Sequence, residues 1–176
     1  SYYTKYSITD NDIQIVPYSK NPDFSKGTTV KAEIETTCEA ETLREWPAID
    51  LGFIGIIYHK EYVNRHIVTI KGLEADSKYC YRIGDAEKGW WSETGVISTA
   101  DNSDSFSFFH MSDPQSTTEK QYNQVFGPAV DFATSNHDGD FILATGDFVD
   151  DGRSFIQWQR MFNSTDALMS IPVMGL

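Results

Sequence analysis

Three carboxylates follow an apolar stretch in the sequence "ATGDFVDDGR" at residues 144–153. Asp147, Asp150 and Asp151 stand there between two glycines. Like charges this close repel each other unless water screens them or a cation lies among them. The spacing therefore predicts either a solvated loop or a cation site. For Asp151 we expect only a cap or turn role, because "DDG" is typical of turns.

A second polar group follows another apolar stretch. "FSFFHM" at 106–111 is followed by "SDPQ", which places Asp113 and Gln115. In open α/β sheets, ligands collect at the carboxyl ends of the strands. Neighbouring parallel strands lie about 4.8 Å apart, so Asp113 and Asp147 can share a cation or a pair of cations if these two stretches are neighbours. Carboxylate and amide oxygens are hard ligands, and the predicted metal ligands are Asp113, Gln115, Asp147 and Asp150.

Other interpretations of these residues are simpler, since a lone aspartate can cap a helix or close an Asx-turn. An EF-hand-like loop is excluded because Val149, which cannot bind a metal, stands two residues after Asp147. No P-loop, G-x-S-x-G or H-E-x-x-H motif occurs. The four histidines are scattered, and for His110, near Asp113, a structural or solvated role is favoured.

The residues that must position these acids alternate between apolar runs and helical patterns. The runs at 106–111, 140–145 and 171–176 predict strands, the first of them buried on both faces. A helix is predicted between the last two strands, over 154–162, with Ser154 as its cap. The order β-α-β-α-β predicts a parallel sheet, whose carboxyl edge would carry the acids.

The other helix is predicted over 117–136, between the first two strands. Thr117 or Thr118 can cap its start. Pro128 should bend it, at a cost of about 3 kcal/mol. Its expected apolar stripe consists of Tyr122, Val125, Phe126, Ala129, Val130 and Ala133.

The first hundred residues predict a β-sandwich. "TTVKAEIETT" at 28–37 alternates apolar and charged side chains, the pattern of a half-buried strand. An edge strand is predicted at 14–18, because Pro17 lacks the donor that a central strand needs. Turn residues separate further candidate strands at 65–73, 78–85 and 92–100.

Tyr79 follows a short polar turn at the start of a predicted strand. Its hydroxyl can fold back onto the turn, as in the tyrosine corner of immunoglobulin-like sandwiches, or its ring can be a simple strand aromatic, and both interpretations are open. "STADNSDS" at 98–105 is polar and small and predicts a linker. The predicted domains are therefore a sandwich over 1–100, a linker over 101–105 and an α/β region over 106–176.

The net charge of −12 is unevenly spread. Residues 1–100 hold 11 Lys and Arg against 15 Asp and Glu, whereas residues 101–176 hold 3 against 11. This acidity disfavours a nucleic-acid partner and suits hard cations, although solubility alone explains it too. The sequence has no run of 18 apolar residues, so it predicts no membrane span. Cys38 and Cys80 match no zinc pattern; free buried thiols are favoured over a disulfide, which would indicate an oxidising compartment.

The order of these motifs resembles the start of a calcineurin-like metallophosphoesterase domain. The resemblance rests on "FSFFHMSDPQS", then "DFILATGDFVDDG", a helix containing "QW", and "IPV". The closest branch is the bacterial purple acid phosphatase-like enzymes, which carry an N-terminal fibronectin type III-like sandwich. The resemblance implies an α+β protein in which the sandwich precedes the first β-α-β-α-β part of the catalytic domain. The family's Asn-His motif would come next, so we expect the domain to be incomplete within these residues.

The resemblance implies two divalent or trivalent metal ions, of iron, manganese or zinc, that activate water for phosphate-ester hydrolysis. Asp113 matches the first metal ligand and Asp147 the carboxylate that bridges the metals. Gln115 stands where many members have His. Asp150 stands where the purple enzymes have the Tyr that colours them, so no charge-transfer band is expected.

The implied substrate is a phosphate-ester small molecule or a nucleotide-like compound. The implied location is secreted, cell-surface or periplasmic, with a signal peptide removed, in line with Ser1 in place of Met. We expect the 176 residues to be inactive or nearly so by themselves. The alternative function is a non-catalytic cell-surface interaction module built on the sandwich.

Overall fold

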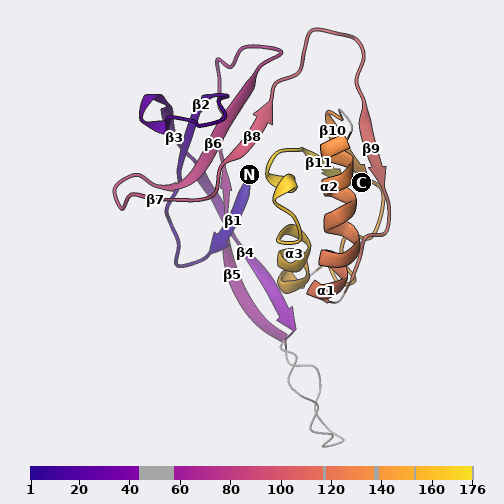
Figure 1. The fold of residues 1–176 in the computed structure, drawn as a ribbon. Coiled ribbons are helices and arrows are strands. Elements are labelled where there is room, and N and C mark those ends of the chain that lie inside the picture. The colour runs from indigo at the N-terminus through magenta and orange to yellow at the C-terminus, as the bar shows by residue number, and fades with distance from the viewer. Residues whose placement is uncertain (44–57, 117, 137–138, 153, 176) are drawn as a thin grey trace, which may run out of the picture.

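The computed structural model describes residues 1–43, 58–116, 118–136, 139–152 and 154–175 (Figure 1). For residues 35–43 and 58–61 the description covers the backbone alone. The fold is a mixture of α and β structure in which strands predominate, arranged in three sheets. An α+β protein is therefore confirmed, while the division into domains at residues 101–105 stays a prediction.

Two antiparallel sheets form the β-rich part, residues 1–98. The first has the strand order β1-β5-β4 and the second the order β3-β2-β6-β7, with β8 also paired to β6. The strands of the first sheet are β1 (Tyr2–Lys5), β4 (Glu33–Leu43) and β5 (Tyr58–Ile67). Those of the second are β2 (Asp12–Pro17), β3 (Thr28–Lys31), β6 (Lys78–Asp85), β7 (Trp90–Trp91) and β8 (Gly95–Ser98), and a short 3₁₀ helix η1 (Phe24–Lys26) connects β2 to β3.

The predicted strand at 28–37 is two strands in two different sheets. The break falls at Ala32, which is buried and lies between β3 and β4. Asn11 causes it, because its backbone carbonyl accepts from Ala32 N (2.8 Å) while its Nδ2 donates to Ala32 O (2.8 Å). The bond from Ala32 N continues the register of β3 with β2, but Ala32 O accepts from a side chain instead of a backbone N–H, so the ladder ends at this residue. Ile34, expected on the buried side, is 40% exposed.

The prediction that residues 14–18 form an edge strand is wrong. β2 lies between β3 and β6, and Pro17 is its last residue. The pairing of β2 with β3 ends at Ile15, opposite Thr28, whereas the pairing with β6 continues to Pro17. The missing donor of Pro17 therefore falls beyond the end of β3, where no ladder bond is lost.

Of the other predicted strands, 78–85 coincides with β6, the one at 65–73 overlaps an observed strand only over 65–67, and the one at 92–100 is longer than the observed strand. β5 ends at Ile67, and β8 covers only Gly95–Ser98. The tyrosine corner is confirmed, since the Tyr79 hydroxyl accepts from Glu74 N (2.9 Å).

Cys80 is a free and buried thiol in the core of the β-rich part, as favoured from the sequence. It packs with Val16, Phe24 and the partly buried Val96. Because the Cys80 thiol is free, no disulfide joins it to Cys38, whose side chain lies outside the described residues.

The remaining residues form a parallel three-stranded sheet with helices, as predicted. The strand order is β11-β10-β9, so β10 is central and the strands at 106–111 and 140–145 are neighbours. The strands are β9 (Phe108–Met111), β10 (Phe141–Ala144) and β11 (Val173–Gly175). The helical elements are α1 (Glu119–Gln121), η2 (Tyr122–Phe126), α2 (Gly127–Asn136), α3 (Phe155–Phe162) and the 3₁₀ helix η3 (Asp166–Met169).

The elements α1, η2 and α2 make one continuous helical segment that contains a π-turn at η2. The Thr118 side chain caps its start by accepting from Gln121 N, as predicted. The π-turn brings Gly127 N onto Tyr122 O, five residues back, just before Pro128. A π-turn holds one residue more than an α-turn, so a spacing of four residues comes closer to one full turn. Tyr122, Phe126 and Val130 follow each other at this spacing and share one buried face.

The predicted apolar stripe of this segment is therefore only half correct. Tyr122, Phe126 and Val130 are buried, but Val125 is 69% exposed and Ala129 is also at the surface. An uninterrupted α-helix would have kept all of these residues on one side, and the π-turn rotates Val125 and Ala129 away.

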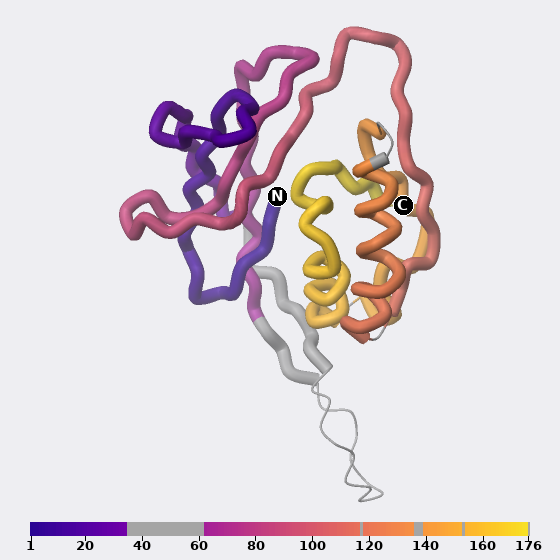
Figure 2. Tube along the Cα trace, in the orientation of Figure 1, coloured from indigo at the N-terminus to yellow at the C-terminus, as the bar shows by residue number. Residues whose placement is uncertain are grey.

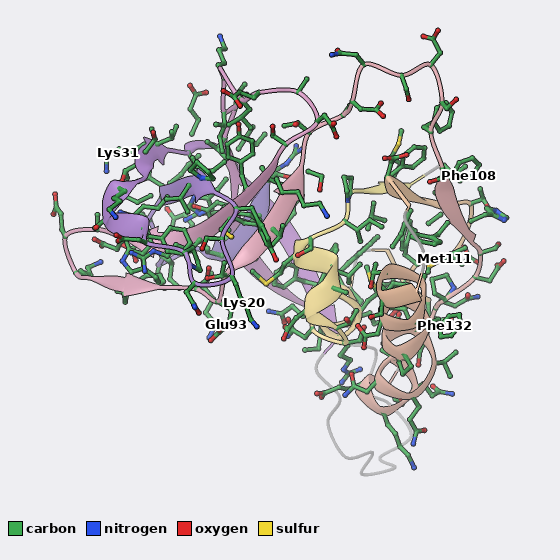
Figure 3. All side chains as sticks on the ribbon, turned by 45° about the horizontal axis from the view of Figure 1, so that its top comes forward. Lys20, Lys31, Glu93, Phe108, Met111 and Phe132 are labelled. Atoms are coloured by element: carbon green, nitrogen blue, oxygen red, sulfur yellow. The ribbon has the colours of Figure 1, made fainter. Side chains whose placement is uncertain are left out.

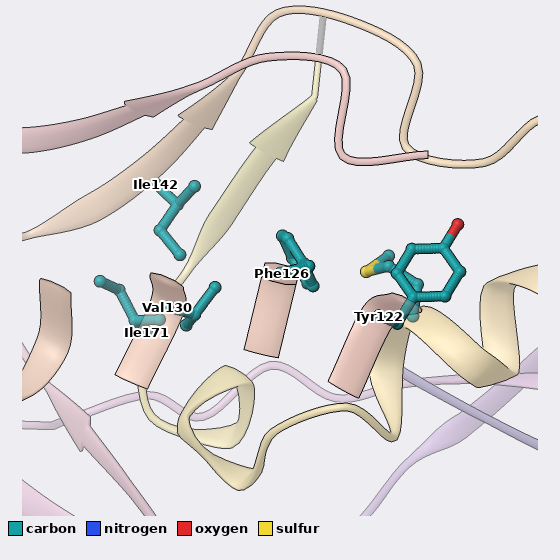
Figure 4. Packing of buried hydrophobic residues seen from close by; sticks show 6 residues of the cluster. Tyr122, Phe126, Val130, Ile142 and Ile171 are labelled. Atoms are coloured by element: carbon teal, nitrogen blue, oxygen red, sulfur yellow. The ribbon is translucent and has the colours of Figure 1, made fainter. Parts of the chain in front are cut away.

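The helices cover only one face of the parallel sheet. Figure 4 shows Tyr122, Phe126 and Val130 in a row along the helical segment, facing Ile142 of β10. The other face carries the stacked rings of Phe108 and Phe141, whose centroids are 5.3 Å apart. Phe108 is 45% exposed (Figure 3). The expectation that the first strand is buried on both faces is thus wrong, because the helices pack on the side of Phe109 and Met111 only.

The β-rich part and the α/β part touch through η3 and the residue that follows it. Tyr81 Oη donates to Met169 O (2.7 Å), and Val96 N donates to Ser170 Oγ (3.2 Å). The connection between β8 and β9, residues 99–107, contains no helix or strand and passes along the outside of the molecule (Figure 2). None of the helices in the described residues is long and apolar enough to cross a membrane.

Candidate functional site

The first loop of the candidate site follows β9 and carries Asp113. This residue has a φ of +52°, a left-handed conformation that is uncommon outside glycine but that Asp tolerates. Ser112 Oγ donates to Asp113 Oδ2, which fixes the carboxylate relative to its own loop. The turn of the backbone directs this carboxylate toward the loop after β10.

The two strand ends meet at Gly146, as the pairing of β9 with β10 predicts. A Cβ atom placed on Gly146 would lie 3.5 and 3.6 Å from the two carboxylate oxygens of Asp113. Asp113 therefore lies over the backbone that immediately precedes Asp147. All four predicted ligands are exposed to solvent, namely Asp113, Gln115, Asp147 and Asp150.

Gln115 bridges the two loops with its side-chain amide. In one orientation of the amide, Nε2 faces Asp147 Oδ2 at 3.5 Å, which is a weak contact. In the other orientation, Nε2 donates to the backbone carbonyl oxygens of Asp113 (2.9 Å) and Asp147 (3.2 Å). The second is more favourable, because the first leaves the amide oxygen facing two acceptors.

The favoured orientation turns the amide oxygen of Gln115 toward the carboxylate of Asp147. Two acceptor oxygens side by side repel each other unless a donor or a cation lies between them. Oxygen donors of this kind suit hard cations. The carboxylates of Asp113 and Asp147 and the amide of Gln115 therefore fit part of the coordination shell of a metal ion.

Asp150 follows Asp147 in the same loop, and its part in the site stays a prediction. Among the contacts of the described residues, none joins it to Asp113, Gln115 or Asp147. Its charge acts on Tyr122: burial is the main cause that raises the pKa of Tyr122, and the charge of Asp150 raises it further. In addition, the described part of the chain holds no cluster of three or more His, Cys, Asp or Glu side chains that could bind a metal.

Two other residues have the roles that the sequence favoured. Asp151 belongs to the turn before α3, since Ser154 N donates to Asp151 O (2.8 Å). His110 is exposed and pairs through Nε2 with Thr145 Oγ1 (2.7 Å) across β9 and β10. Ser154 stands at the predicted cap position of α3, but its side chain makes no cap hydrogen bond.

Three side chains that sequence reasoning did not assign to the site hold the loop after β10. Gln157 Oε1 accepts from Asp151 N (3.0 Å), and Trp158 Nε1 donates to Gly152 O (2.9 Å). The hydroxyl of Tyr122 donates to Phe148 O (2.9 Å). The adjacent "QW" in the sequence was the available signal for the first two, while Tyr122 had only an expected core position.

Comparison of the chain with protein-family models gives no match, and comparison with curated protein sequences gives none either.

Proposed function

We propose that the protein to which this chain belongs is a metal-dependent phosphoesterase, and that the loops after β9 and β10 supply part of its metal site. The observation that carries the proposal is the meeting of Asp113, Gln115 and Asp147 at the carboxyl ends of two neighbouring parallel strands. The resemblance of the motifs around these residues to metallophosphoesterases gives the reaction class. The proposed substrate is a phosphate-ester small molecule or a nucleotide-like compound.

In this proposal Asp113 and Asp147 bind metal through their carboxylates and Gln115 through its amide oxygen. Two bound metal ions would supply charge neutralisation and activated water at a phosphate ester. The chain's own residues fix where that chemistry takes place: Ser112 holds the Asp113 carboxylate, and the Gln115 amide sets the spacing between the two loops.

Binding of Mn²⁺ tests the proposal, measured by loss of the free-ion signal in electron paramagnetic resonance. We expect the 176-residue chain to bind Mn²⁺ and Asp147→Ala to weaken binding at least about 10-fold, the scale for loss of a group at a metal site. Asp166→Ala is the matched control, because Asp166 is an exposed carboxylate on η3. Equal affinity of Asp147→Ala and the wild type would overturn the proposed site.

Turnover of p-nitrophenyl phosphate gives a second measurement. Two carboxylates and one amide are fewer donors than two metal ions need, so we expect little or no turnover by these residues with manganese, iron or zinc. Rapid turnover would show that the catalytic site lies elsewhere in the chain.

A non-catalytic interaction module is the second candidate function. Exposed tyrosines on the first β-sheet and the segment beside it favour it: Tyr3, Tyr6 and Tyr62 are 48%, 61% and 53% exposed. The rings of Tyr6 and Tyr62 lie 6.2 Å apart and form a small aromatic surface. Tyrosine is enriched at protein interfaces because it combines an apolar ring with a polar tip. Metal binding that does not depend on Asp147 would favour this candidate over the phosphoesterase.

A further inference from the structure

A single buried hydroxyl joins the two loops of the proposed metal site. Tyr122 is fully buried, at 0% exposure, on the π-turn η2. Its hydroxyl accepts from Ser116 N (3.0 Å) and donates to Phe148 O (2.9 Å). Ser116 directly follows Gln115, and Phe148 directly follows Asp147. The hydroxyl therefore connects the backbone next to one proposed ligand with the backbone next to another.

This connection lies beside the one made by Gln115. The Gln115 amide bridges the backbone carbonyls of Asp113 and Asp147 at the solvent-exposed side. From the buried side, the Tyr122 hydroxyl bridges Ser116, which follows Gln115, and Phe148, which follows Asp147. With both bridges in place, the spacing between the two loops is fixed from two directions. Hydrogen bonds made in a buried setting are lost at greater cost than exposed ones.

The local fold keeps Tyr122 in position. The helix start is tied to the same loop, because Ser116 Oγ donates to Gln121 Oε1 (2.6 Å) and accepts from Thr118 N (3.1 Å). Figure 4 shows the Tyr122 ring at the end of the row of core residues, with its hydroxyl directed away from that row.

The π-turn and Gly127 also help to place Tyr122. π-turns are rare and often occur at functional sites. Here the π-turn lets Tyr122 keep both its core contacts and its two loop contacts. A Cβ atom on Gly127 would lie 2.3 Å from Ser164 O, so only glycine lets the helical segment pack this closely against the residues after α3.

We propose that Tyr122 is a positioning residue of the metal site, which sets the distance between the loop of Gln115 and the loop of Asp147 through its hydroxyl. The inference rests on the proposed function and adds to it a buried residue that does not touch the metal. Outer residues that hold metal ligands typically contribute about 10-fold to 100-fold in affinity.

The test is Tyr122→Phe in the full chain, which removes the hydroxyl and keeps the ring. We expect Mn²⁺ affinity to fall about 10-fold, with the fold retained by circular dichroism. Tyr81→Phe is the matched control: it removes a hydroxyl that donates to Met169 O (2.7 Å), away from both loops. We expect that variant to bind Mn²⁺ as the wild type does.

The outcomes separate this inference from the proposed function. If the wild type binds Mn²⁺ and Asp147→Ala does not, while Tyr122→Phe binds as well as the wild type, the positioning role is wrong and the metal site stands. If the two tyrosine variants lose affinity equally, the effect is one of general stability and the positioning role is again wrong. If the wild type does not bind Mn²⁺, both proposals fail.

Hydrogen exchange of the wild type gives a test that does not depend on a variant that folds. If metal binding and the Tyr122 bridge stabilise the same loop spacing, each must strengthen the other. We expect Mn²⁺ to slow amide exchange, measured by mass spectrometry, in peptides that contain Ser116. Unchanged exchange at a Mn²⁺ concentration that saturates the protein would overturn the positioning role.

Discussion

Two groups of carboxylates, one in each part of the molecule, are held in opposite ways. In the β-rich part, Asp12 is 6% exposed, accepts from Ala86 N (2.9 Å) and pairs with Lys31 (3.1 Å). Asp10 and Asp85 at the same end share Lys88, at 2.7 and 2.9 Å. In the α/β part, Asp113 and Asp147 are exposed and lie together at the strand ends.

This difference separates carboxylates that serve the fold from carboxylates that are available to a ligand. The backbone hydrogen bonds around Asp85, together with Lys88, lower the pKa of its carboxyl and keep it ionised. A buried or paired carboxylate of this kind is needed by the structure around it. An exposed pair whose neighbouring amide also offers an oxygen gains most from a cation.

The largest effect is expected in the core of the α/β part. Ile142 is 1% exposed and lies under the helical segment. Ile142→Ala should lower the free energy of unfolding by about 3 kcal/mol, the sum of lost burial and a cavity. Urea unfolding measures it, with Val125→Ala as control because Val125 is 69% exposed. Equal losses in the two variants would show that the π-turn does not orient the helix as described.

A smaller loss in the free energy of unfolding is expected when the buried carboxylate of Asp12 is removed. Asp12→Ala removes the acceptor of Ala86 N and the partner of Lys31, and should cost about 2 kcal/mol, the scale for hydrogen bonds to a charged group. Asp23→Ala is the control, since Asp23 is exposed and caps only the three-residue η1. A neutral result for Asp12→Ala would remove the contrast between the two parts.

The pH dependence of stability should reveal a third buried group, His66 in β5. Thr4 Oγ1 donates to Ile8 O (3.1 Å), so its 2.8 Å contact with His66 must have Nε2–H as donor. Nδ1 is then a bare acceptor, and within the described residues it has no partner. Burial lowers the pKa of His66, an effect that the charge of Asp10 opposes.

Because the folded-state pKa is below the unfolded value of about 6.5, the unfolded chain takes up the proton more readily. The contribution of neutral His66 to the free energy of unfolding is therefore complete at pH values above the unfolded-state pKa. It is lost as pH falls toward and through the folded-state pKa. Urea unfolding at pH 7.5 and pH 5.5 measures it. His66→Gln should show a smaller difference between the two pH values than the wild type. Equal differences would mean that His66 does not contribute.

The smallest effect on stability is expected at the proposed site. Asp147→Asn should change the free energy of unfolding by no more than about 0.5 kcal/mol, as is usual for an exposed residue outside the core. Thermal unfolding without metal measures it. A loss as large as that of Asp12→Ala would show that Asp147 serves the fold, and the contrast between the two regions would then disappear.

Local patterns in the sequence predicted much of the framework. The strand at 78–85 was predicted with its observed bounds, and the order β-α-β-α-β with a parallel sheet was confirmed, while the pairing of 106–111 with 140–145, which the sequence left open, is observed. These predictions succeeded because period and composition are local properties of the chain. The cap at Thr118 and the bond from Glu74 N to Tyr79 are local too, and each was one of two alternatives that the sequence left open.

The errors came where a distant residue decides. Asn11, 21 residues from Ala32, splits the strand at 28–37, and the end of β3 makes Pro17 acceptable in a central strand. The π-turn and the open face of β9 depend on what packs against them.

The sequence by itself determined which residues can meet, because strands that alternate with helices bring the ends of parallel strands to one edge. Only the tertiary structure decided how Asp113, Gln115 and Asp147 meet: Asp113, in a left-handed conformation, lies over Gly146, and the Gln115 amide bridges the two loops. The physical reason is that hydrogen bonds between segments far apart in the chain, such as those of the Tyr122 hydroxyl to Ser116 and Phe148, leave no periodic signal in the sequence.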